Sequence, residues 1–92
     1  MDYRVRLVVR CVGGSLVEER VSCAIGRQGA SVEDRDRVRR QGGGVDQMMT
    51  IRLPGSEQLQ RVLRAIETVK GAAIVETVQL EPVPAGEWGP SQ

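Results

Sequence analysis

A helical run bracketed by glycine turns constrains the fold of this chain more than any other feature. The run from Ser15 to Gln28 follows the pair Gly13-Gly14 and precedes Gly29. Glycine adopts the backbone angles that tight turns need, and it is common just past the end of a helix. Serine accepts hydrogen bonds from the open N–H groups of a helix start, so Ser15 is expected to cap this run. The stretch therefore predicts a strand, a tight turn, a helix, a second tight turn and another strand.

The segment before this helix alternates between apolar and charged residues. One face would carry Tyr3, Val5, Leu7, Val9 and Cys11, and the other Arg4, Arg6, Val8 and Arg10. A repeat of two that is rich in β-branched residues indicates a half-buried strand. The arginine face is expected to be solvated or covered by a partner.

The scarcity of aromatic residues and the lack of histidine limit the core and the chemistry. Tyr3 and Trp88 are the only aromatic residues among 92, so the core must be aliphatic. Without histidine the usual Ser-His and Cys-His nucleophile pairs cannot form, and the commonest metal ligand is missing. Asp34 and Asp36 lack further ligands at useful spacing, which favours ion pairs with Arg35, Arg37, Arg39 and Arg40. We therefore expect no enzymatic activity, no metal and no cofactor.

Charge and cysteine usage bear on partners and location. Thirteen basic and twelve acidic residues give a net charge of +1, which disfavours a dedicated nucleic-acid binder. Cys11 and Cys23 lie within apolar runs, so we predict two buried free thiols and a cytoplasmic location. No apolar run approaches the ~20 residues of a membrane span. We therefore predict no signal peptide and no membrane association.

The charged segment from Ser31 to Arg40 allows two interpretations. Val32, Asp34, Asp36 and Val38 share strand parity, and a charged strand is tolerated at the edge of a sheet. A second helix is the competing interpretation. A strand here would lead into a hairpin turn at 41–44, which reads Gln-Gly-Gly-Gly.

The second half of the chain shows clearer periodicity. Asp46 to Leu53 alternates as a strand, with Val45, Gln47, Met49, Ile51 and Leu53 on one side. Ser56 is expected to cap a helix whose apolar positions run from Leu59 to Val69 and which stops at Lys70-Gly71. Ala72 to Leu80 reads as a final strand. Residues 81–92 are rich in proline and glycine and are predicted to form a flexible C-terminal tail.

The element order βαββαβ predicts an α+β, ferredoxin-like fold. Its four strands would form one antiparallel sheet with both helices on one face. Nothing in the chain covers the other face, where Val8, Met48 and Thr50 would lie. A second copy is expected to bury that face or an exposed edge, so we predict a homodimer.

Residues 1–80 resemble the ACT domain, a ferredoxin-like regulatory module. The resemblance rests on a glycine turn after the first strand, Ile25-Gly26 before Gly29, Ala30-Ser31-Val32, Asp34-x-Asp36-x-Val38-Arg39, Met49-Thr50-Ile51 and Val69-Lys70-Gly71-Ala72. The combination of Ala24-Ile25-Gly26-x-x-Gly29 with Asp36-x-Val38-Arg39 is most similar to the ACT modules of some bacterial malic enzymes.

The resemblance implies an allosteric module that binds a small amino acid at a dimer interface and acts on a fused or partner metabolic enzyme. The residues that match the family's site are Cys11, Gly13, Gly14, Ser15 and Leu16 of one subunit and Ser31, Val32 and Asp34 of the other. The family usually has Asn or Asp and then Pro-Gly at the turn, and Asn in the second strand. Here Cys11 and Ser31 offer fewer side-chain partners, although backbone N–H groups at the helix start remain for a carboxylate. A purely structural dimerisation role stays open.

Binding of single-stranded nucleic acid is the alternative function. The run Gly26-Arg27-Gln28-Gly29 is similar to the Gly-x-x-Gly loop of a KH domain, which clamps a nucleic-acid backbone. This interpretation needs a helix over Ser31 to Arg40 with an apolar face. That segment offers only Val32 and Val38 among charges, so nucleic-acid binding is disfavoured.

Overall fold

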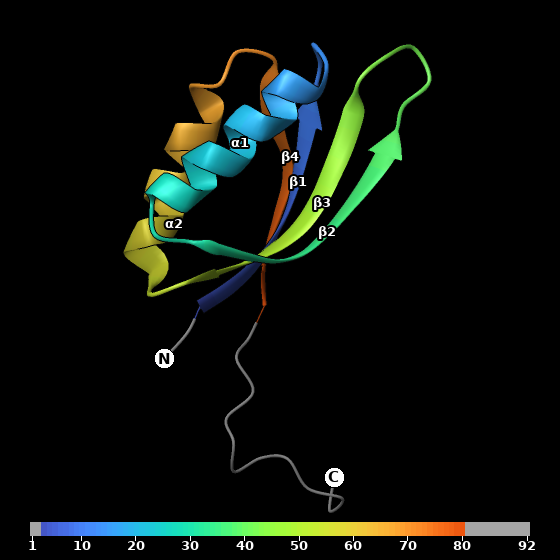
Figure 1. The fold of residues 1–92 in the computed structure, drawn as a ribbon. Helices are drawn as coiled ribbons and strands as arrows, with labels where there is room; N and C mark the ends of the chain where they lie inside the picture. The colour runs from blue at the N-terminus through green and yellow to red at the C-terminus, as the bar shows by residue number, and fades with distance from the viewer. Residues whose placement is uncertain (1–2, 81–92) are drawn as a thin grey trace, which may run out of the picture.

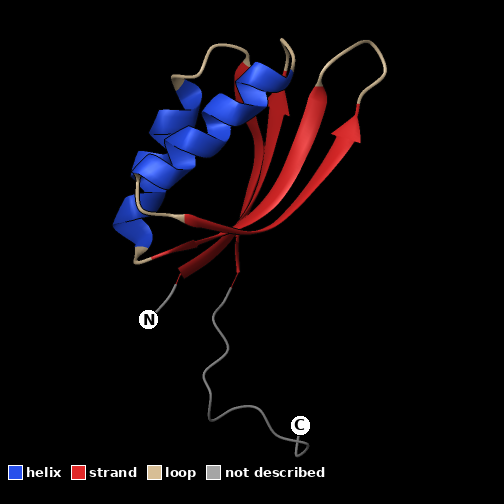
Figure 2. Ribbon diagram, viewed as in Figure 1, coloured by secondary structure: helices blue, strands red, loops and turns tan. Residues whose placement is uncertain are grey.

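The computed structural model describes residues 3–80. Six elements follow one another: β1 (Tyr3–Cys11), α1 (Ser15–Arg27), β2 (Ser31–Arg39), β3 (Val45–Leu53), α2 (Ser56–Glu67) and β4 (Ala72–Leu80). The strands form one antiparallel sheet in the order β2-β3-β1-β4, and both helices lie against the same face (Figures 1 and 2). The predicted ferredoxin-like α+β fold is confirmed. The predicted tail, 81–92, lies outside the described residues.

The core lies between the helices and the inner face of the sheet. Alternate residues of the two central strands and one stripe of each helix are buried: Val5, Leu7, Val9, Cys11, Val17, Val21, Ile25, Met49, Ile51, Leu53, Val62 and Ile66. All are aliphatic or sulfur-containing, as the scarcity of aromatic residues predicts. Neither helix in residues 3–80 is long and apolar enough to cross a membrane.

A β-bulge at Glu33 changes which residues of β2 share a face. Val32 pairs with Ile51 of β3, but Asp34 pairs with Thr50, so the bulge adds one residue to β2. The prediction that Val32 shares a face with Asp34 is therefore wrong, because an extra residue inverts the alternation that follows it. Val32 packs against the core, whereas Asp34, Asp36 and Val38 lie on the open face.

The strand conformation of β2 also bears on the alternative function. The KH-like interpretation needs a helix over this segment, and residues 31–39 form a strand instead. That requirement is therefore contradicted.

Three local details differ from expectation. Gly14 is the N-cap of α1 and Gly55 that of α2, and neither helix has a side-chain cap, so Ser15 and Ser56 are first helical residues. Helix α2 ends at Glu67 and not at Lys70 as predicted. The next residue, Thr68, donates a hydrogen bond from its side chain to the Ala65 carbonyl and closes a turn.

The two cysteines have different environments. Cys11 is buried on β1, but Cys23 is exposed on α1, so only the first of the two predicted buried thiols is confirmed. Val21 and Ile25 take the buried positions in that part of α1 and leave Cys23 on an outer flank.

Gly71 joins the α2–β4 turn to the end of β1. The N–H of Val12 donates to the Gly71 carbonyl with an N···O distance of 2.7 Å. Gly71 has a φ of +94°, and a Cβ there would overlap the Val12 carbonyl oxygen. Only glycine satisfies both requirements.

Replacing Gly71 with alanine should destabilise the domain strongly. Gly71→Ala is expected to lower the free energy of unfolding by about 2 kcal/mol or more, because it combines backbone strain with a clash. Gly26→Ala is the matched control, since a Cβ there meets nothing within 4 Å. The control should gain about 0.5–1 kcal/mol from helix propensity. Urea unfolding monitored by circular dichroism measures both, and equal midpoints for the two variants would contradict the expectation.

Candidate functional site

A groove lined largely by polar and charged residues lies between α1 and β2 at one side of the sheet. Because the bulge inverts the alternation of β2, Arg35 and Arg37 pair with Met49 and Gln47 on the face that the helices cover. The hollow has a volume of about 540 Å³. We call it the α1–β2 groove; it is lined by Ser15, Glu18, Glu19, Ser22, Cys23, Arg35, Arg37 and Gln47.

Glu18 is the central group of this groove. Its side chain is 11% exposed and accepts two hydrogen bonds from the Arg37 guanidinium, at 2.6 Å from Nε and 3.1 Å from Nη2. Gln47 Nε2 donates to the same carboxylate at 2.9 Å. The hydrogen bond from Arg37 lowers the pKa of Glu18, although burial opposes it. The groove therefore contains a fixed negative charge at neutral pH.

Gln47 leaves one buried acceptor without a partner. The residue is 2% exposed, and its Oε1 has no hydrogen-bond partner among the described residues. Such a group costs about 1–3 kcal/mol, so it points to a donor from outside the chain, either a water molecule or a ligand. Gln47 reaches the groove floor from β3.

Arg35 contributes a positive charge to the same groove. Its Nη2 donates to Ser22 Oγ at 2.8 Å, and Arg35 forms no ion pair within residues 3–80. Two of its three guanidinium nitrogens are therefore open to a bound anion. The α1–β2 groove thus combines a cation that has no ion pair within residues 3–80 with a carboxylate and an unpartnered amide oxygen.

A smaller hollow of about 210 Å³ lies beside the glycine turn. It is lined by Cys11, Gly13, Gly14, Glu18, Arg39, Arg40, Gly43, Gly44 and Val45. It shares Glu18 with the α1–β2 groove, which Ser15 also lines. The two hollows are therefore neighbours, and four of the predicted site residues line one or the other: Cys11, Gly13, Gly14 and Ser15. Leu16 is 53% exposed and lines neither.

The other predicted site residues lie at the opposite end of the sheet. Cys11 pairs with Val45 of β3, but Ser31 pairs with Arg52. Positions 45 and 52 are seven residues apart, or roughly 23 Å at ~3.3 Å per residue. One chain does not bring Ser31, Val32 and Asp34 to the glycine turn. Their contribution from a second subunit stays a prediction.

The charges of the open sheet face neutralise one another in two groups. Glu33 accepts from Arg4 and Arg52, and Asp46 accepts from Arg10 and Arg40. The predicted ion pairs of Asp34 and Asp36 with their arginine neighbours do not form within residues 3–80. Across the described residues, no group of three or more ligating side chains gathers around a metal position.

Sequence reasoning missed Glu18, Arg35, Arg37 and Gln47 as site residues. Gln47 carried a visible signal, because it is the one polar residue in the otherwise apolar inner row of β3. Glu18 follows Val17 on the buried side of α1. The role of Arg37 could not be seen, because the bulge at Glu33 decides which face it takes.

The comparisons with known proteins agree on the fold. The chain matches a protein of unknown function from Galdieria sulphuraria over 92% of its own length and 49% of that chain, at 17% identity and a TM-score of 0.73. It also matches a homoserine dehydrogenase from Thiobacillus denitrificans over 88% of its length and 18% of that chain, at 15% identity and a TM-score of 0.71. It matches the ACT domain from the GTP pyrophosphokinase of Chlorobium tepidum over 87% of its length and 97% of that chain, at 11% identity and a TM-score of 0.60.

These likenesses establish a shared architecture. No protein-family model and no curated protein sequence matches the chain. The chain spans about half the length of the Galdieria protein and a smaller share of the dehydrogenase. At such identities the shared property is the ferredoxin-like fold that ACT domains also have. The link to malic enzymes stays a prediction.

Removing the Arg37 guanidinium should raise the pKa of Glu18. The folded protein holds this pKa below its ordinary value of 4.5, so the interaction stabilises the fold above that pH. Its contribution is lost as pH falls through the folded-state pKa. Carbon-detected NMR titration of the Glu18 carboxyl should show a higher midpoint in Arg37→Ala than in the wild type.

Arg39→Ala is the control for this titration, because Arg39 lies two residues along β2 and forms no ion pair within residues 3–80. Its Glu18 midpoint should match that of the wild type. An unchanged midpoint in Arg37→Ala would show that Arg37 does not set the charge of Glu18.

Proposed function

We propose that this chain is a regulatory module that binds a small amino acid in the α1–β2 groove and has no catalytic activity of its own. The unpartnered Oε1 of Gln47 carries the proposal, because it needs a donor from outside the chain. An ammonium group satisfies this acceptor and the adjacent Glu18 carboxylate together. The α-carboxylate of the same ligand then pairs with the Arg35 guanidinium.

The chemistry of the groove favours a zwitterion over a simple anion or cation. A simple anion would meet Glu18 and Glu19, and a simple cation would meet Arg35 and Arg37. An amino acid presents both charges a few bonds apart and meets each with its opposite. The volume of about 540 Å³ lies in the range of small-molecule sites.

The hollow at the glycine turn extends this site. The start of α1 has no side-chain cap, and the N–H of Val17 donates to the Gly14 carbonyl, so the N–H groups of Ser15 and Leu16 are the ones available to an acidic group. Arg39 lines the same hollow and forms no ion pair within residues 3–80, whereas the Glu18 carboxylate there is already paired with Arg37. A ligand whose side chain is acidic therefore fits better than one whose side chain is basic. Ser31, Val32 and Asp34 of a second subunit complete the site in this proposal.

The module is further proposed to act as a homodimer on a fused or partner metabolic enzyme in the cytoplasm. The similarity to the dehydrogenase covers only 18% of that chain, which supports a role within a larger assembly. The open sheet face supports self-association, because Val38, Met48 and Val78 are exposed there by 51%, 39% and 40%. Regulation follows if ligand binding changes how two copies or their host associate.

Amide and side-chain NMR shifts should identify the ligand. Titrating each common amino acid to ~10 mM covers the weak affinities expected of a regulatory site. The Gln47 side-chain amide and the backbone of Gly13 to Ser15 should shift and saturate for a few related amino acids. No saturable shift with any of them would leave only the structural role.

Gln47→Met tests whether the Gln47 amide takes part in ligand binding. The substitution keeps the side-chain length, but it removes the Nε2 donor to Glu18 together with the unpartnered acceptor, so the free energy of unfolding should fall by about 1–3 kcal/mol while the protein stays folded. Affinity for the identified amino acid should fall about tenfold or more, as measured by calorimetry. Gln60→Met on the exposed side of α2 is the control and should bind normally. Undiminished affinity in Gln47→Met would contradict the proposed site.

Sedimentation should show a dimer that depends on the open sheet face. Met48→Glu places a charge among the exposed apolar residues of that face and should yield a folded monomer. Gln60→Glu, on the exposed side of α2, makes the same change of one charge away from the sheet and should stay dimeric. A monomeric wild type at high micromolar concentration would argue against this interface.

A further inference from the structure

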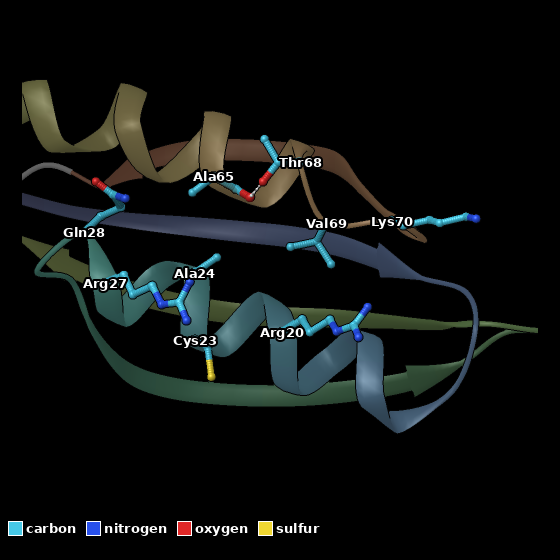
Figure 3. A pocket seen from close by; sticks show the side chains of 9 residues that line it. All are labelled: Arg20, Cys23, Ala24, Arg27, Gln28, Ala65, Thr68, Val69 and Lys70. Atoms are coloured by element: carbon cyan, nitrogen blue, oxygen red, sulfur yellow. Dashed lines mark hydrogen bonds between the residues drawn. The ribbon is translucent and has the colours of Figure 1, made fainter.

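A second groove lies on the opposite flank of α1, between the two helices (Figure 3). We call it the interhelix groove. Its volume is about 550 Å³, and Arg20, Cys23, Ala24, Arg27, Gln28, Ala65, Thr68, Val69 and Lys70 line it. Cys23 also lines the α1–β2 groove, so one helix forms a wall of both.

The interhelix groove gathers uncompensated positive charge. Arg20, Arg27 and Lys70 line it, and no carboxylate does. None of these three cations forms an ion pair within residues 3–80. The arginines that pair with carboxylates are instead on the sheet or next to the end of β2: Arg4, Arg10, Arg37, Arg40 and Arg52. The charge of this hollow therefore favours the binding of an anion.

The spacing of the cations indicates how many anionic groups fit. Arg20 and Arg27 are seven residues apart on α1, which is ~10.5 Å along the helix axis. Figure 3 shows Ala24 between them and Lys70 beyond Val69, toward the Arg20 end of the groove. The arginine side chains are long and flexible, so both guanidinium groups can turn toward the middle of the hollow. A single phosphate group then meets one guanidinium, whereas two linked phosphate groups can meet both.

The floor of the groove admits a ligand between the helices. Ala24 and Ala65 face the hollow with small side chains, and the Thr68 hydroxyl already donates to the Ala65 carbonyl. The amide of Gln28 is a neutral donor and acceptor at the far end from Lys70 (Figure 3). The cations lie along α1 and at the turn after α2, at the border of a hollow between the helices. That shape suits a small molecule better than an extended polyanion.

We propose that the interhelix groove binds a small phosphorylated molecule with at least two anionic groups. Arginine pairs with phosphate through two parallel hydrogen bonds, so Arg20 and Arg27 each hold one group. Lys70 adds a point charge from the turn between α2 and β4. This site is separate from the proposed amino-acid site, so a negative binding result for one site does not contradict the proposal for the other.

Pyrophosphate and inorganic phosphate are the probes for a direct test. Calorimetry on the whole chain at physiological salt should show saturable binding of pyrophosphate, about tenfold tighter than that of phosphate because two groups are held. Equal binding of the two probes would overturn the two-group arrangement. Absence of saturable pyrophosphate binding would overturn the site.

Charge variants locate the binding. Arg20→Gln and Arg27→Gln should each weaken pyrophosphate binding about tenfold, because each removes charge-assisted hydrogen bonds. Arg61→Gln removes an exposed cation that does not line the groove and should leave affinity unchanged. Equal affinity in all three variants would mean that binding follows overall charge, which would overturn the proposal.

The exposed thiol supplies an independent readout. Cys23 lines the groove, whereas Cys11 is 2% exposed and serves as an unreactive internal reference. Saturating pyrophosphate should slow alkylation of Cys23 in the wild type and not in Arg27→Gln. An unchanged rate in the wild type would place the anion elsewhere. Matching amide spectra of the variants confirm that each is folded.

Discussion

The buried carboxylate of Glu18 determines how one side of this domain is built. A carboxylate at 11% exposure needs strong donors, and Arg37 and Gln47 supply them from two neighbouring strands. Replacing a buried ion pair with apolar residues is often neutral or stabilising. Stability alone therefore does not explain why Glu18, Arg37 and Gln47 occupy positions that apolar core residues could fill. Its presence leaves a groove with fixed charges beside a packed aliphatic interior.

The bulge at Glu33 makes this arrangement available. By adding one residue to β2, it directs Arg35 and Arg37 to the inner face and Asp34 to the outer one. Without the bulge the aspartates would face Glu18, and like charges would meet in a half-buried space. The bulged residue itself pairs with Arg4 and Arg52 on the open face. One inserted residue thus sorts the charges of the edge strand between two surfaces.

The sequence predicts much more of the fold than of the site. Alternation in β1 and β3 and the apolar stripe of α2 are local signals, and they place the elements to within a few residues. The register of β2 depends on which residue forms the β-bulge. The charged residues of this strand give no local signal that the bulge is at Glu33. The glycine turn was visible at Gly13-Gly14. The hydrogen bond between Gln47 and Glu18 joins residues 29 positions apart, so it cannot be predicted until the packing of α1 on the sheet is known.

The order of charges along β2 also limits how two copies of this chain can pair through their β2 edges. Residues opposite each other in an antiparallel pair share a face. Two β2 edges paired about a twofold axis would therefore set arginines against arginines inside and aspartates against aspartates outside. The N–H of Arg35 is already held by the Asp34 side chain at 3.0 Å. Such an edge resists open-ended growth of the sheet, which protects the folded protein from aggregation through this strand.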